Sequence, residues 1–110
     1  MAGKFYPKAQ EQLLNIWDYT ERTWGEEQAN IYIHGLIQVV ESAVSQRHLW
    51  RPATDNSLLD IFFIRYRHHF IFFRELSKGR LGVISVLHEN MDLPVRLKQD
   101  VEDQASSFLE

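Results

Sequence analysis

The sequence predicts an α+β fold in which an N-terminal helical hairpin packs on a small antiparallel sheet, with a helical tail at the C-terminus. Three observations support this fold class. Helical periodicities fill the first half of the chain, strand-like runs fill the second half, and a short amphipathic segment follows a proline near the end. The expected order of elements before the tail is β-α-α-β-β-β, an arrangement of two packed layers.

The predicted sheet is centred on a hairpin between His69 and Asp92. Its first arm, residues 70–73, is aromatic and β-branched, a composition that suits a half-buried strand. A turn at residues 77–79 ends in a glycine, which can take a positive φ. The second arm, residues 81–87, is mostly apolar on both alternating faces. We therefore expect this arm in the middle of the sheet, with other elements packed on each side.

Two further strands are expected around this hairpin. Residues 61–66, IFFIRY, form a strand that enters the hairpin through a tight connection at Arg67 and His68. Residues 4–6 are short and apolar, and they are expected at an edge of the sheet. Residues 51–57 are rich in turn formers and predict an irregular loop.

Two antiparallel helices are expected before these strands. Residues 9–24 carry apolar side chains at helical spacing, and Pro7 suits the first turn. Gly25 is expected to end this helix as a left-handed cap, and the second helix is expected to run from Glu26 to His48. So short a connection forces an antiparallel hairpin. Three large aromatic side chains of the hairpin are expected in the core: Trp17, Trp24 and Tyr32.

The composition narrows the class of protein. A chain of 110 residues with 45% hydrophobic residues is one domain with a real core, and the absence of cysteine excludes disulfides and thiolate chemistry. No apolar run approaches the roughly 20 residues that span a bilayer. The first residues lack the apolar centre of a signal peptide, so we expect a cytoplasmic protein with no membrane partner. No cofactor and no metal site are expected.

The charge is unevenly distributed along the chain. The net charge is -3, and the balance of Lys98 against Asp100, Glu102, Asp103 and Glu110 accounts for all of it. The body of the chain is therefore neutral, with a basic middle and an acidic tail. This is not the strongly basic footprint of a protein that binds nucleic acid through phosphate contacts, so nucleic acid is expected to be involved only indirectly.

Three stretches carry motifs, and their order and spacing identify a family resemblance. They are PKAQEQLLNIWDY at residues 7–19, WGEEQA at residues 24–29, and HFIFFR at 69–74 with VLHENMD at 86–92. The last pair is close to the pattern H-x-I-F-Y-R … I-L-H-x-x-M-D. Together they resemble the ParE branch of the RelE/ParE toxin superfamily of bacterial toxin–antitoxin modules. The fold of that superfamily agrees with the β-α-α-β-β-β order expected from the sequence pattern.

The resemblance implies a small cytoplasmic toxin held inactive by a cognate antitoxin, and hence a toxin–antitoxin hetero-oligomer. ParE-type members are known as inhibitors of DNA gyrase that leave cleaved DNA trapped on the enzyme, and they are not regarded as catalysts. RelE-type members on the same fold are ribosome-dependent mRNA endonucleases. A third hypothesis is a partner-binding module that has lost its toxicity. The fold does not distinguish these functions, so the site must.

The residue types favour the gyrase inhibitor over the endonuclease. Cleavage of RNA needs a base, an acid and cations that neutralise the developing charge. No lysine lies between Lys8 and Lys78, and the net charge is negative. The side chains that could serve as base, acid or cation are Arg65, Tyr66, Arg67, His68, His69, Arg74 and His88. We assign no catalytic residue. The candidate partner-binding residues are Arg65, Arg67, His69, Arg74, His88 and Met91.

The arginines among these candidates also have structural interpretations. Arg65 and Arg67 flank Tyr66 in an alternating pattern, so both are expected to project from one face, where they grip an acidic partner or are solvated. Arg74 binds a partner, pairs with a nearby carboxylate of Glu75, Glu89 or Asp92, or caps the end of a helix.

The histidines and Met91 have structural interpretations as well. The neighbours His68 and His69 face opposite ways on a strand, which favours a turn or packing role over a metal site. His88 and Met91 are expected to close the end of the last strand.

The tail divides the chain into a toxin domain, residues 1–92, and an amphipathic segment, residues 93–110. Its apolar residues recur every three or four positions over about three helical turns, too few for a helix that is stable alone. The tail therefore needs a surface. Either it folds back across the basic face of the same molecule, or it recruits a second copy or the antitoxin.

Overall fold

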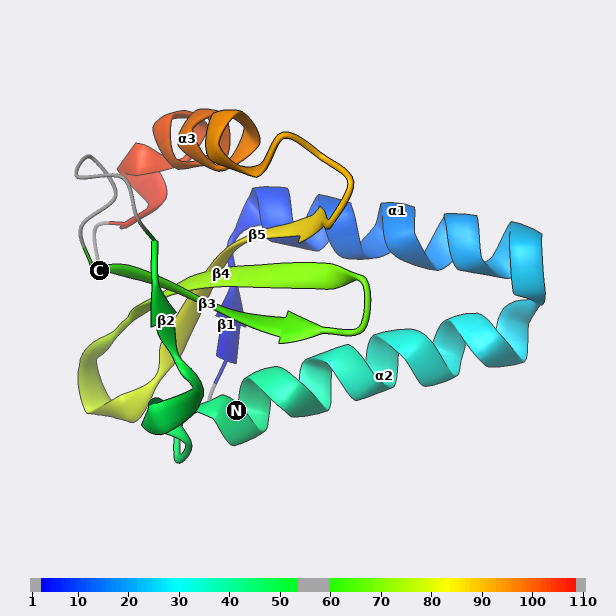
Figure 1. The fold of residues 1–110 in the computed structure, drawn as a ribbon, viewed down its shortest axis with the longest axis horizontal. Coiled ribbons are helices and arrows are strands. Elements are labelled where there is room, and N and C mark those ends of the chain that lie inside the picture. The colour runs from blue at the N-terminus through cyan, green and yellow to red at the C-terminus, as the bar shows by residue number, and fades with distance from the viewer. Residues whose placement is uncertain (1–2, 54–59, 109–110) are drawn as a thin grey trace.

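The computed structural model describes residues 3–53 and 60–108, so residues 54–57 of the predicted loop and residues 109–110 of the tail lie outside the described residues. The predicted α+β order is confirmed: a helical hairpin, a sheet and a C-terminal helix follow one another (Figure 1). The elements are β1 (Gly3–Phe5), α1 (Pro7–Trp24), α2 (Glu26–Ala43), the 3₁₀ helix η1 (Arg47–Leu49), β2 (Arg51–Pro52), β3 (Ile61–Tyr66), β4 (His69–Glu75), the 3₁₀ helix η3 (Ser77–Gly79), β5 (Leu81–His88), α3 (Leu93–Asp103) and the 3₁₀ helix η4 (Ala105–Phe108).

The sheet has five strands in the order β1-β5-β4-β3-β2. Strands β3, β4 and β5 form the predicted antiparallel meander, and β1 joins β5 in parallel at an edge, as expected. Strand β2 was not predicted, because residues 51 and 52 were assigned to a loop. Its two residues pair with Phe62 and Phe63. A strand this short shows no alternation in sequence, and its proline is tolerated because the strand lies at an edge.

A β-bulge in β5 changes which side chains share a face. Phe72 pairs with Ser85 and Phe73 pairs with Val83, so Ile84 is an extra residue. The expected strict alternation along this strand is therefore wrong beyond Val83. Val86 packs toward the helical hairpin, whereas Ile84 packs toward the tail. The same shift directs His88 to the hairpin side, where its ring contacts that of His69.

The ends of the helices differ in detail from the prediction. Gly25 has the expected positive φ of 96°, but its ψ of 164° is extended rather than left-handed helical. Helix α2 ends at Ala43 rather than at His48. The cause is Trp50, whose indole N–H donates to the Ala43 carbonyl at 2.8 Å while its ring packs edge-on against Phe73. Because the indole packs against the sheet, the chain leaves the helix axis after Ala43.

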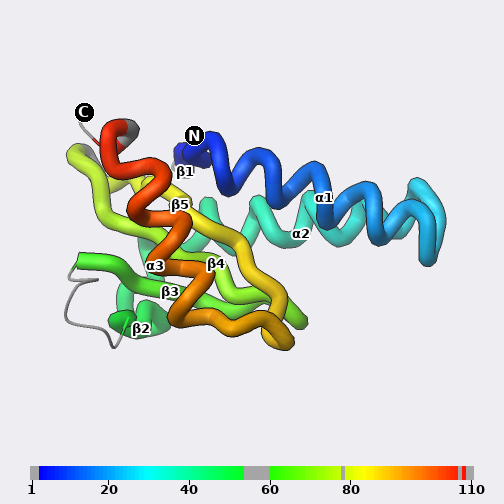
Figure 2. The backbone as a smooth tube through the Cα atoms, turned by 90° about the horizontal axis from the view of Figure 1, so that it is seen from above, coloured from blue at the N-terminus to red at the C-terminus, as the bar shows by residue number. Residues whose placement is uncertain are grey.

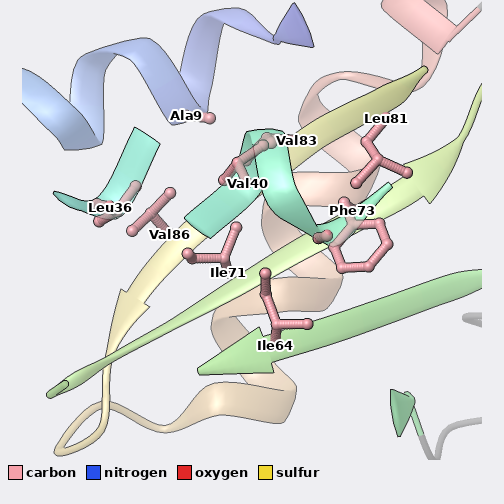
Figure 3. Packing of buried hydrophobic residues seen from close by; sticks show 10 residues of the cluster. Ala9, Leu36, Val40, Ile64, Ile71, Phe73, Leu81, Val83 and Val86 are labelled. Carbon is pink, nitrogen blue, oxygen red and sulfur yellow. The ribbon is translucent and has the colours of Figure 1, made fainter. Parts of the chain in front are cut away.

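The core lies in two layers, one on each face of the sheet. Between the sheet and the hairpin, Leu36 and Val40 of α2 meet Ile71 and Phe73 of β4, and Val86 of β5 (Figure 3). Between the sheet and the tail lies a second cluster, made of Tyr6, Ile61, Phe72, Ile84, Leu87 and Leu97. The expectation that β5 is covered on both faces is therefore confirmed.

The joined end of the helical hairpin projects beyond the strands (Figures 1 and 2). Trp24 is the last residue of α1 and is 71% exposed, so its predicted place in the core is wrong. Trp17 is half-buried and donates its indole N–H to Asn30 of α2 at 2.9 Å. Tyr32 is half-buried against the hairpin-side cluster.

The tail folds back onto its own sheet, with α3 lying across the strands (Figure 2). Leu97 of α3 is buried against the sheet. The Phe108 ring packs against that of Tyr6, with the ring centroids 5.0 Å apart. Arg74 donates to the Phe108 carbonyl at 3.0 Å. The tail therefore contacts the sheet through buried apolar side chains and through hydrogen bonds. The boundary at residue 92 stays a prediction.

Candidate functional site

A groove of about 680 Å³ opens between the projecting hairpin and the nearby end of the sheet. One wall is formed by α1 and α2, which contribute Ile16, Tyr19, Trp24, Ile31 and Tyr32. The opposite wall is formed by the β3–β4 turn and the end of β5. It contributes Tyr66, Arg67, His68, His69, His88 and Met91.

The groove gathers exposed apolar side chains. Tyr19, Trp24, Ile31 and Met91 are 63%, 71%, 52% and 43% exposed, and they are four of the seven large apolar side chains that are exposed in the described part of the chain. Apolar surface concentrated in this way marks an interaction site. Aromatic residues and methionine are also the residue types enriched at protein–protein interfaces.

The floor of the groove holds a hydrogen-bonded pair, Tyr32 and His69. The Tyr32 hydroxyl lies 2.8 Å from Nδ1 of His69, and the His69 ring meets that of His88 edge-on at 5.2 Å. Burial, with smaller effects of His88 and His68, lowers the pKa of His69 to about 4. Burial also raises the pKa of Tyr32. Both side chains are therefore neutral at neutral pH.

Gly35 allows α2 to approach the neighbouring tyrosine of the floor. A β-carbon at Gly35 would overlap the Tyr66 hydroxyl and lie 3.0 Å from its Cζ. The Tyr66 ring packs edge-on against Tyr32, with centroids 5.1 Å apart. Neither Gly35 nor the exposure of Trp24 was predicted. A glycine inside a strongly helical pattern was the signal for a close approach, because glycine disfavours a helix interior.

Glu89 binds two side chains near the groove, Arg65 and His68. Its carboxylate binds Arg65 Nη2 at 2.5 Å and lies 2.8 Å from His68 Nδ1. The hydrogen bond from His68, with the charge of Arg65, lowers the pKa of Glu89. Arg67 lies in the β3–β4 turn with a positive φ of 52° and packs over the Tyr66 ring. Among the described residues that line the groove, Arg67 is the only arginine, and no lysine or carboxylate joins it.

The structure brings together four of the six candidate partner-binding residues, Arg67, His69, His88 and Met91. Arg65 lies over the Phe70 ring instead, so the expectation that it shares a face with Arg67 is wrong. The reason is that Arg67 belongs to the turn and not to the strand.

Arg74 does not line the groove. The structure shows it at the tail, over the Phe108 ring and bound to that residue's carbonyl. Two further properties hold for residues 3–53 and 60–108: no three His, Asp or Glu side chains gather closely enough to hold a metal ion, and no helix is long and apolar enough to cross a membrane.

Comparison with known proteins identifies the family. Residues 4–93 match the family described as ParE toxin of type II toxin-antitoxin system, parDE. The chain is 32% identical over 87 residues to Toxin ParE1 of Mycobacterium tuberculosis, covering 79% of this chain and 88% of that protein. It is 33% identical over 92 residues to Toxin ParE of Escherichia coli, covering 82% and 86%.

A solved structure described as a chromosomal ParDE TA system from P. aeruginosa has the same fold. It matches with a TM-score of 0.64 at 18% identity, covering 80% of this chain and 95% of that one. This likeness shows the fold, an α+β arrangement of a helical hairpin packed on a small sheet. By its sequence, the chain belongs to the ParE toxin family of type II toxin–antitoxin systems.

Proposed function

We propose that this protein is a toxin that inhibits DNA gyrase by binding it, and that a cognate antitoxin neutralises it in a hetero-oligomer. The protein itself makes and breaks no covalent bond, and it acts in the cytoplasm. The observation that carries the proposal is the groove, in which Tyr19, Trp24, Ile31 and Met91 present exposed apolar surface. Surface of this kind suits a macromolecular partner.

The charges around the groove argue against RNA cleavage by this chain. Such a reaction needs cations at the phosphate and a proton donor or acceptor with a pKa near neutrality. Arg65 and His68 are bound to Glu89. His69 has a pKa of about 4, and Arg74 lies at the tail. Of the three candidate arginines, only Arg67 then lines the groove, where a phosphate would bind.

Induction of the protein in cells distinguishes the functions under consideration. A gyrase inhibitor produces an SOS response while mRNA stays intact. Cut mRNA without an SOS response supports the RelE-like endoribonuclease instead, and normal growth supports a partner-binding module without toxicity. A Tyr19→Ala, Trp24→Ala variant should lose toxicity, because it removes two exposed groove aromatics without touching the core. Full toxicity of this variant would contradict the groove as the acting surface.

The groove is also the expected seat of the antitoxin. A segment that folds on contact could place apolar anchors between the two walls and an acidic residue beside Arg67. Arg67→Glu should therefore weaken the complex by about tenfold at low salt and by less at high salt. Arg51→Glu is the matched control, since it makes the same charge change at an exposed position of β2 outside the groove. Equal effects of the two substitutions in titrations with the antitoxin would remove the groove from consideration.

A further inference from the structure

A buried polar cluster joins the tail to the helical hairpin through the sheet. Its members are Gln12 of α1, Ser85 of β5, and Asp100 and Gln104 of the tail; the exposed fractions of the last three are 0%, 2% and 5%. The family match ends at residue 93, so the two tail residues lie outside it. None of the four lines the groove.

The cluster satisfies backbone groups of β5 that lie beyond the end of its pairing with β1. Strand β1 pairs with β5 only as far as Val83. Beyond that point, the Val86 N–H donates to Gln12 Oε1 at 2.7 Å, and Gln104 Nε2 donates to the Ile84 carbonyl at 2.9 Å. Buried backbone groups require such partners, so the positions of these two side chains are tightly restricted.

Asp100 ties the two sides of the cluster together. Its Oδ2 accepts from Gln12 Nε2 at 2.9 Å and from the Ser85 hydroxyl at 2.6 Å. Gln104 makes a second tie, because its Oε1 accepts from the Lys8 backbone N–H at the start of α1 at 2.8 Å. The tail therefore holds α1 at two points, both in the half of the helix that lies over the sheet.

The far half of α1 forms a wall of the groove and projects beyond the strands (Figure 1). Trp24 follows Gln12 by twelve residues, or roughly 18 Å of helix. A tilt of about 5° at Gln12 would move the helix backbone at Trp24 by about 1.5 Å. The α2 wall has its own attachment, the bond between Tyr32 and His69. The far half of α1 is also bonded to α2, through the Trp17 indole N–H and Asn30. The polar cluster fixes the near half of α1 on the sheet, so it helps to set the direction in which the far half projects.

We infer that Gln12, Ser85, Asp100 and Gln104 are positioning residues that set the α1 wall of the groove, so that the tail controls partner binding without touching the partner. The effect of these residues on the orientation of α1 is a property of the protein without a partner. The consequence for affinity rests on the proposed function, in which the antitoxin occupies the groove.

A swap of donor and acceptor tests this inference. Gln12→Glu places a second carboxylate against Asp100, whereas adding Asp100→Asn restores a donor: the new amide donates to the new carboxylate, which still accepts from the Val86 N–H. The chain has no cysteine, so spin labels can be attached at Asp18→Cys on α1 and Asn90→Cys after β5, which are exposed and outside the groove. Dipolar spectroscopy then reports the distance across the groove.

We expect a single narrow distance in the parent, a shifted or broadened one in Gln12→Glu, and recovery in the double variant. Antitoxin affinity should fall at least tenfold and recover in the same way. Leu97→Ala is the matched control: it loses buried contacts of α3 without touching the cluster, so it should lower stability and leave the distance unchanged.

Several outcomes would overturn the inference. One is a folded Gln12→Glu variant with the parent distance, and another is a double variant that does not recover. If Gln12→Glu does not fold, regained folding of the double variant supports the inference and its failure to fold contradicts it. A distance that moves while antitoxin affinity stays constant would leave the positioning role intact and contradict the groove as the antitoxin's seat.

Discussion

At the scale of the residue, the groove is defined by neutral rather than charged side chains. Tyr32 and His69 bind each other on its floor, and Glu89 binds the Arg65 guanidinium and the His68 ring. The sequence analysis predicted Arg67, His69, His88 and Met91 as candidates, and the structure groups them. Whether they bind a partner stays a prediction. The spacing of residues in the sequence could not predict the ion pair between Arg65 and Glu89, because this pair forms only once two separate parts of the sheet come together.

The low pKa of His69 predicts a pH dependence of stability. The unfolded side chain, with an ordinary pKa near 6.5, takes up a proton as the pH falls through that value, whereas the folded one does so only near pH 4. The free energy of unfolding should therefore decrease as the pH is lowered from about 6.5 to about 4. Below pH 4, His69 should cause no further decrease.

Urea unfolding of the parent and of His69→Gln at several pH values measures this contribution. Glutamine stays neutral and can still bond to the Tyr32 hydroxyl. The parent should lose more stability than the variant across the window, because other titrating groups act equally on both. Parallel curves for the two proteins would show that His69 titrates normally in the folded state.

At the scale of the element, hydrophobic periodicity and turn-forming residues were sufficient to predict the helical hairpin, the strand meander and the tail helix. Three features were not predictable in this way. Strand β2 is too short to show a pattern, the bulge at Ile84 changes parity within a run that is apolar throughout, and α2 ends early because Trp50 caps Ala43. Each depends on a tertiary contact and not on local propensity.

The approach of α2 to β3 gives a prediction at this scale. Alanine in a helix interior is normally about 0.5–1 kcal/mol more stable than glycine. Gly35→Ala should instead destabilise the protein, since the new methyl group overlaps the Tyr66 hydroxyl. In a Tyr66→Phe background the same substitution should regain most of the lost stability. A double-mutant cycle by thermal unfolding provides the measurement, and additive effects would contradict the contact.

At the scale of the whole molecule, the sheet is covered by the helical hairpin on one face and by the tail on the other. The hairpin extends past the strands (Figure 1). An apolar groove lies at that end. Sequence motifs identified the family, and the family match confirms it. They could not show that the exposed aromatics lie at this end, because helical periodicity does not reveal how far a helix projects beyond a sheet.

The most direct test of the account is the effect of the purified protein on purified gyrase and supercoiled plasmid. We expect linear DNA to accumulate, covalently held by gyrase, when detergent and protease end the reaction. Trp24→Ala should reduce this accumulation at least tenfold, and Leu49→Ala, which also removes an exposed apolar side chain but lies outside the groove, should not. Unchanged gyrase activity at molar excess of the protein, together with cleavage of mRNA on ribosomes, would contradict the account.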